Sequence, residues 1–143
     1  MMLGPNAIHS AIKSEQRAPV KRDDPEHREQ VRLFVWIDTE QDDEIIKQAY
    51  AVPNGGKRSI GVAKKLKAEG VRAGECDINL DVARGGYFGL RIELKADGGH
   101  VSPLQHARIR EHRANGYAAE VCVGWEAARD ELLAYAGLRP TGE

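Results

Sequence analysis

Two strand-like runs joined by a Gly-Gly turn constrain the fold of this chain more than any other feature. The runs cover residues 76–83 and 87–95, and each is mainly apolar around a few charged positions. Two consecutive glycines at 85–86 favour a tight turn, so the sequence predicts an antiparallel hairpin. The point midway between Asp77 and Glu93 falls on this turn. These two carboxylates are therefore expected to face each other across the hairpin.

The expected pair of carboxylates indicates a cation site. Directly opposed residues of a hairpin have Cβ atoms roughly 4.5–5.5 Å apart, and two carboxylates at that distance repel each other unless a cation lies between them. Oxygen ligands of this kind suit a hard divalent ion such as Mg²⁺. Glu93 and Lys95 are two residues apart and share a face of the strand, so the lysine can hold a water or a phosphate beside the pair. The alternative interpretation is an ion pair within a hairpin.

Length and composition fit one globular domain. The chain has 143 residues, of which 41% are hydrophobic and 30% charged. No apolar run approaches the roughly 20 residues of a membrane span. The N-terminus has no basic segment followed by an apolar stretch, so it does not resemble a signal peptide. Cys76 and Cys122 lie in apolar runs and are expected to be buried, reduced thiols. We therefore expect a cytoplasmic protein without a disulfide framework or a zinc site built on cysteine.

The distribution of charge along the chain is more informative about a nucleic-acid partner than the net charge of −1. Six basic residues and one acid lie between Lys57 and Arg72. A local basic stretch can form a phosphate-binding face although the total charge is near zero. The alternative is a solvated helix face.

The expected secondary structure alternates helices and strands. Asp24-Pro25 begins a helix that extends to about residue 40, and residues 1–23 form a polar N-terminal extension before the domain of residues 24–143. The further elements are a strand at 48–52, a helix at 59–69, the hairpin, a helix at 102–114, a strand at 117–123 and a helix at 124–137. The order α-β-α-β-β-α-β-α predicts an α/β fold, with a mixed sheet of about four strands and helices on both faces.

Five segments together resemble the VRR-NUC family of PD-(D/E)xK nucleases, in its stand-alone phage or prophage form. They are Pro53-Asn54-Gly55-Gly56-Lys57-Arg58, residues 67–71 with Gly74 and Asp77, residues 89–95 with Glu93-Leu94-Lys95, Ser102-Pro103 with Gln105, and Asn115-Gly116-Tyr117 with Ala119 and Val121. The resemblance covers roughly residues 24 to 136 and implies a restriction-endonuclease-like fold. One departure is Glu75-Cys76, where the family more often has a small residue and proline.

The resemblance also implies site residues. Asp77, Glu93 and the backbone carbonyl of Leu94 are expected to bind Mg²⁺ or Mn²⁺, with Lys95 acting on water and phosphate. Glu29 on the first helix is expected to complete the metal site, and Glu26, one turn earlier, is the competing candidate. Gln105 is expected near the metal-bound phosphate.

DNA contacts are expected from the loop and the helix that follow the first strand. The glycines let backbone N–H groups approach phosphate closely, and Arg58 can hold a phosphate with two hydrogen bonds. The expected set is Asn54, Gly55, Gly56, Lys57, Arg58, Lys64 and Lys65. For the loop, the alternative is a plain turn.

The function implied is metal-dependent hydrolysis of DNA phosphodiester bonds, leaving a 5′-phosphate and a 3′-hydroxyl. The resemblance further implies a homodimer that cuts four-way junctions or other branched DNA, in phage replication, recombination or repair inside a bacterial host. The residues leave open the preferred DNA structure, endonuclease or exonuclease action, the number of metal ions and any partner protein. A catalytically silent nucleic-acid-binding subunit is the alternative; it predicts loss of Asp77, Glu93 or Lys95, yet all three are present.

Overall fold

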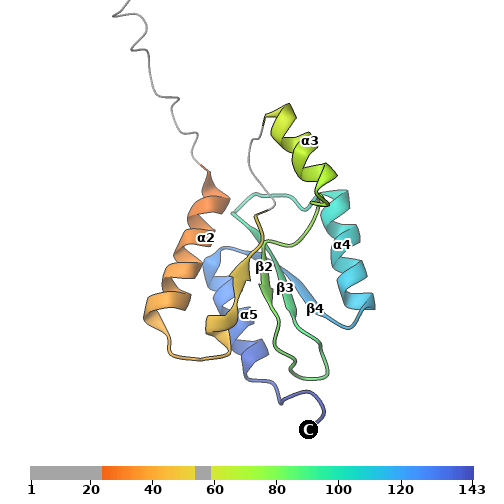
Figure 1. Ribbon diagram of the computed structural model, residues 1–143. Coiled ribbons are helices and arrows are strands. Elements are labelled where there is room, and N and C mark those ends of the chain that lie inside the picture. Colours follow the sequence, from red (N-terminus) through yellow and green to blue (C-terminus); the bar gives the residue numbers. More distant parts are fainter. Residues whose placement is uncertain (1–23, 54–58) are drawn as a thin grey trace, which may run out of the picture.

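The computed structural model describes residues 24–53 and 59–143, and its elements follow the expected order (Figure 1). They are α2 (Pro25–Val35), η1 (Trp36–Glu40), η2 (Ile46–Gln48), β1 (Tyr50–Ala51), α3 (Ile60–Ala68), β2 (Ile78–Leu80), β3 (Leu90–Lys95), α4 (Pro103–Ala114), β4 (Ala118–Val123) and α5 (Trp125–Ala136). The α/β fold with a mixed four-stranded sheet is confirmed. The expected extension of residues 1–23 and the loop residues Asn54, Gly55, Gly56, Lys57 and Arg58 lie outside the described residues.

The four strands lie in the order β1-β2-β3-β4. The pairs β1–β2 and β2–β3 are antiparallel, and β3 pairs with β4 in parallel through a crossover that contains α4. Ile78 lies opposite Ile92 and Leu80 opposite Leu90. Continued by one residue, this register places Asp77 opposite Glu93, as the sequence predicts.

The hairpin is less regular than expected, because β2 covers only Ile78–Leu80 instead of residues 76–83. Beyond its end, Asp81 accepts side-chain hydrogen bonds from Tyr50 at 2.6 Å and from Arg91 at 2.8 Å. The turn itself is where the glycines indicate: Gly85 and Gly86 both have positive φ, at 60° and 89°. This backbone is the one that a two-residue hairpin turn requires, and glycine adopts it without strain.

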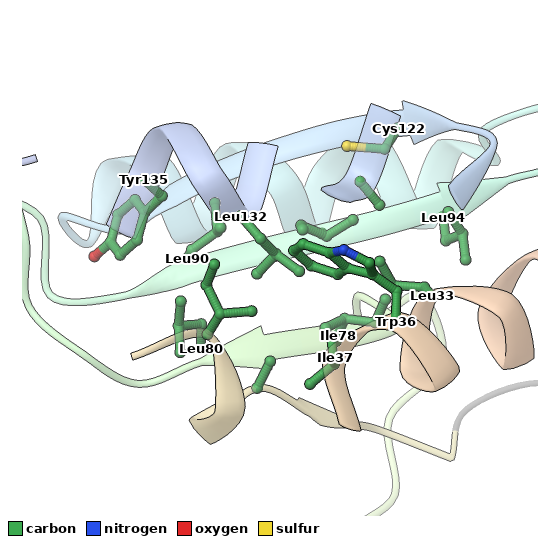
Figure 2. Packing of buried hydrophobic residues seen from close by; sticks show 14 residues of the cluster. Leu33, Trp36, Ile37, Ile78, Leu80, Leu90, Leu94, Cys122, Leu132 and Tyr135 are labelled. Carbon is green, nitrogen blue, oxygen red and sulfur yellow. The ribbon is translucent and has the colours of Figure 1, made fainter. Parts of the chain in front are cut away.

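Each face of the sheet is covered by helices. Alternate residues of β3 point to opposite faces. Leu90, Ile92 and Leu94 pack with α2 and α5 around Leu33 and Leu132 (Figure 2). The side chains of Arg91, Glu93 and Lys95 point to the opposite face of the sheet and are buried as well. Since α4 contacts both β3 and β4 and its Gln105 reaches Glu93, the charged face of β3 is the one beneath α4.

The helix ends follow local sequence rules. The side chain of Asp24 accepts a hydrogen bond from the backbone of His27, and Pro25 begins α2. Ser102 and Gln105 form a capping box at the start of α4. Among the described residues, no helix combines the length and apolar character needed to cross a membrane.

Candidate active site

Asp77, Glu93 and Lys95 come together where β3 ends beside the start of β2. Oδ2 of Asp77 accepts a hydrogen bond from the backbone N–H of Leu94 at 2.8 Å. Nζ of Lys95 lies 3.2 Å from Oε1 of Glu93. The structure therefore brings together the three side chains that the sequence singles out.

Glu93 is the most deeply buried member of the site, with 1% of the residue exposed. Its Oε1 accepts a hydrogen bond of 2.6 Å from Nε2 of Gln105 and also faces Lys95. Its Oε2 is buried and has no hydrogen-bond partner among residues 24–53 and 59–143. Burial, followed by the negative charge of Asp77, raises the pKa of Glu93 to about 7 although Lys95 opposes the shift. A buried carboxylate oxygen without a partner is costly unless a ligand or an ion satisfies it.

Lys95 carries the positive charge of the site and is 6% exposed. Besides Glu93, its Nζ faces Oε1 of Glu26 at 3.6 Å. Burial lowers the pKa of Lys95, but the hydrogen bond to Glu93 and the charges of Glu93, Glu26 and Asp77 outweigh it, so the net shift is upward. The side chain is therefore a fixed ammonium group that can donate hydrogen bonds to a water or a phosphate oxygen.

Asp77 is partly buried, and burial raises its pKa despite the hydrogen bond from the Leu94 N–H. The carbonyl of Leu94 lies on the same side. The carbonyl of the next residue, Lys95, accepts a hydrogen bond from Gly124 at the β4 edge. Because successive carbonyls of a strand point to opposite edges, that of Leu94 points towards the edge where Asp77 lies.

The first helix supplies Glu26 to this site, while Glu29 is placed differently. Oε2 of Glu29 accepts a hydrogen bond of 2.7 Å from the backbone N–H of Trp125, the first residue of α5. The preceding residue, Gly124, provides no side-chain cap, so Glu29 caps that helix. Of the two candidates that the sequence leaves open, the structure sets Glu26 beside Lys95.

Gln105 has two tasks at the start of α4. Its Oε1 accepts a hydrogen bond from the backbone N–H of Ser102 at 2.8 Å, and its Nε2 donates to Glu93. The predicted residue is thus held by the capping box while it orients the buried carboxylate.

A cleft of about 430 Å³ opens next to Asp77 and Leu94. Its other walls come from α2 and from the segment after β1, including Glu26, Gln30 and Val52. The cleft gives solvent and ligands a route to the Asp77 side of the site.

Lys64 and Lys65 lie on α3, which projects beyond the end of the sheet (Figure 1). All nine residues of α3 are described, and none of them is buried. Within the described part of the chain, the ion pair of Lys65 is a long contact with Glu69, at 4.0 Å between two exposed groups. As far as residues 24–53 and 59–143 show, these two side chains are open to a partner.

A second group of possible metal ligands lies between α4 and the segment that precedes β2. Ligand atoms of Glu75, Cys76 and His112 all lie within 4.8 Å of one another. Sequence spacing could not predict this group, because Glu75 and His112 are 37 residues apart. Cys76 and Cys122 are both free and buried, as expected, and burial raises each thiol pKa to about 12.

Asp77, Glu93 and the Leu94 carbonyl together fit a hard divalent cation. They are oxygen donors with a concentrated negative charge, as Mg²⁺ and Mn²⁺ prefer. Such an ion would explain why Oε2 of Glu93 is buried without a hydrogen-bond partner in the part of the chain that the structure describes.

The mixed sheet with its flanking helices is the PD-(D/E)xK nuclease-like fold. A solved structure described as a VRR_NUC domain protein is 30% identical in sequence, covers 83% of this chain and 93% of its own, and superposes with a TM-score of 0.71. The chain belongs to the VRR-NUC domain family. No family model and no curated protein matches the sequence. The family indicates a nuclease.

Proposed function

We propose that this protein is a Mg²⁺- or Mn²⁺-dependent DNA endonuclease whose site is formed by Asp77, Glu93 and Lys95. The observation that carries the proposal is the buried Glu93 carboxylate. One of its oxygens is held by Gln105 and Lys95, and the other has no partner within the described residues. A cation that also binds Asp77 would satisfy this oxygen and offset the repulsion between the two carboxylates.

Asp77, Glu93 and the Leu94 carbonyl would hold the cation, with Glu26 close by. A divalent ion bound there supplies a Lewis acid that acidifies a water molecule and neutralises charge on the scissile phosphate. Glu29, the other sequence candidate, would act through α5 because its carboxylate binds Trp125. Glu26 is therefore the residue of α2 that would complete the cation site.

Lys95 would act on the water or the phosphate, and Gln105 would hold the Glu93 side chain in place. Nζ of Lys95 would donate a hydrogen bond to the attacking water or to a non-bridging phosphate oxygen, and so stabilise the charge of the transition state. The 2.6 Å bond from Gln105 fixes the Glu93 side chain. A carboxylate held in this way does not have to reorganise when cation and phosphate arrive.

Branched DNA is the proposed substrate, and a homodimer is the proposed assembly. Lys64 and Lys65 on the projecting α3 would contact phosphates, together with the loop residues from Asn54 to Arg58. A two-fold dimer would place two active sites at a fixed separation, which suits the paired cuts of a four-way junction. The proposed setting is phage replication, recombination or repair inside a bacterial cell.

Cleavage of DNA in the presence of different cations tests the proposal. A quenched-fluorescence DNA substrate should be cut with Mg²⁺ or Mn²⁺ and weakly or not at all with Ca²⁺, which prefers more ligands and longer bonds. Full cleavage in excess chelator would rule out the metal mechanism. DNA binding without cleavage in both Mg²⁺ and Mn²⁺ would instead support the catalytically silent alternative.

A further inference from the structure

The segment that leads into Asp77 lies along α4. A Cβ atom built on Gly74 would come within 2.9 Å of the backbone carbon of Leu104. Oε2 of Glu75 accepts a hydrogen bond of 2.8 Å from Nε of Arg108, and Oε1 lies 2.6 Å from Nε2 of His112. Residues 104, 108 and 112 are spaced by four and form one stripe of the helix. The contact therefore continues over two turns of α4.

Both sides of this contact lead to the active site. Asp77 follows Glu75 by two residues, and Gln105, which holds Glu93, directly follows Leu104. The two carboxylates of the proposed cation site are thus supported by the same helix. Gln105 holds one of them directly, and the Glu75 contacts fix the backbone that carries the other.

We propose that Glu75 is a positioning residue of the cation site: by binding Arg108 and His112 it sets the distance of Asp77 from Glu93. The inference rests on the proposed function, because it concerns the same cation. These two contacts, made by a carboxylate to side chains of α4, restrain the segment that leads into Asp77.

The surroundings of Glu75 support a restraint stronger than that of a surface ion pair. Only 21% of the Glu75 side chain and 7% of the His112 side chain are exposed. The next residue, Cys76, is fully buried and packs with Ile109 of α4 and Ala119 of β4. The segment is therefore fixed by apolar contacts on one side chain and by polar contacts on its neighbour.

A metal ion bound by Glu75, Cys76 and His112 is the competing interpretation, and the distances disfavour it. Two ligands bound to zinc at about 2.0–2.1 Å with tetrahedral angles lie about 3.3 Å apart. The Glu75 and His112 atoms are 2.6 Å apart, a hydrogen-bond distance. The other oxygen of Glu75 is already bonded to Arg108.

Mn²⁺ binding by purified variants tests the inference. Free Mn²⁺ is measured by electron paramagnetic resonance in titrations of the wild type, Glu75→Gln and Glu40→Gln. Glu40→Gln is the control, because it removes the charge from an exposed Arg32–Glu40 pair elsewhere. Loss of an outer-shell partner typically costs 10–100-fold in metal affinity. We expect Glu75→Gln to raise the Mn²⁺ dissociation constant about tenfold and Glu40→Gln to leave it unchanged.

Further measurements separate positioning from a general loss of structure. In Glu75→Gln, the Mg²⁺ concentration for half-maximal cleavage should rise, while the rate at saturating Mg²⁺ recovers most of the wild-type value. If Glu75→Gln does not fold, Arg108→Lys serves instead: it keeps the charge but loses the Nε donor, and it should also weaken Mn²⁺ binding.

Wild-type Mn²⁺ affinity in folded Glu75→Gln, or in folded Arg108→Lys if that variant is used, would overturn the inference. So would zinc in the purified wild type that is lost in Cys76→Ser. Failure of the wild type to bind Mn²⁺, or unchanged binding in Asp77→Asn, would contradict the proposed function itself.

Discussion

Gln105 donates a hydrogen bond of 2.6 Å to Glu93, and the same amide group closes the capping box of α4 through the N–H of Ser102. The start of a helix and a buried carboxylate of the central strand are thus joined by one side chain. Because Oε1 of Glu93 is held in this way, Oε2, which has no hydrogen-bond partner among the described residues, has a defined place at the site.

Glu93→Gln should stabilise the metal-free protein at alkaline pH. The folded-state pKa of Glu93 is about 7, raised from 4.5, so the folded protein keeps a proton that the unfolded chain loses between these values. Wild-type stability from this group is therefore present below about pH 4.5 and is lost as pH rises through 7. In chelator at pH 8, thermal unfolding should show the variant to be more stable by on the order of 1–3 kcal/mol. At pH 4.5 the two proteins should differ little; an equal difference at both pH values would contradict the assignment.

Alanine substitution should separate the roles of Glu26 and Glu29. Glu29→Ala removes the cap of α5 and should lower the free energy of unfolding by about 1 kcal/mol. Glu26→Ala removes an exposed partner of Lys95 and should reduce DNA cleavage with little change in stability. Chemical denaturation and cleavage rates of both variants check this. The opposite pattern, with Glu29→Ala inactive at full stability, would restore Glu29 as the site residue.

Lys65→Ala should weaken DNA binding in a salt-dependent way. Each lost phosphate contact lowers the slope of log K against log salt by about 0.9 for duplex DNA. Lys47→Ala is a suitable control, because Lys47 lies in η2 and already pairs with Glu44. Fluorescence anisotropy at several salt concentrations gives both slopes. An unchanged slope for Lys65→Ala would mean that the basic face of α3 is only solvated.

The purified protein should be a homodimer in solution, so light scattering should give it a mass about twice the 15.8 kDa of one chain. A small domain with one basic surface contacts few phosphates, and a two-fold dimer doubles that surface. The dimer should also cut four-way junctions faster than linear duplex of equal length. A monomer mass at micromolar concentration, or equal rates on the two substrates, would refute the corresponding half of this prediction.

Local sequence patterns predict much of the fold. The Gly-Gly turn and the spacing of Asp77 and Glu93 predicted the hairpin register, because the turn glycines permit positive φ and a strand has a period of two. The short length of β2 could not be predicted in this way. It ends where Asp81 bonds with Tyr50, 31 residues away in sequence, and with Arg91.

The proximity of the strand residues Asp77, Glu93 and Lys95 could be predicted from the sequence, but the placement of the helix residues of the candidate site could not. Glu26 and Glu29 both lie on α2, and helical periodicity alone does not decide between them. The choice depends on where α5 begins, since its first N–H binds Glu29. The contact of Glu75 with His112 depends on how α4 lies on the sheet, which no local pattern reports.

Cleavage by Lys95→Ala and Glu93→Gln tests the central claim most directly. Both variants should fold, as circular dichroism can verify, and Lys95→Ala should still bind Mn²⁺. We expect each variant to cleave DNA with Mg²⁺ on the order of 10²–10³ times more slowly than the wild type. Wild-type turnover by either purified, folded variant would contradict the assignment of Asp77, Glu93 and Lys95 as the active site.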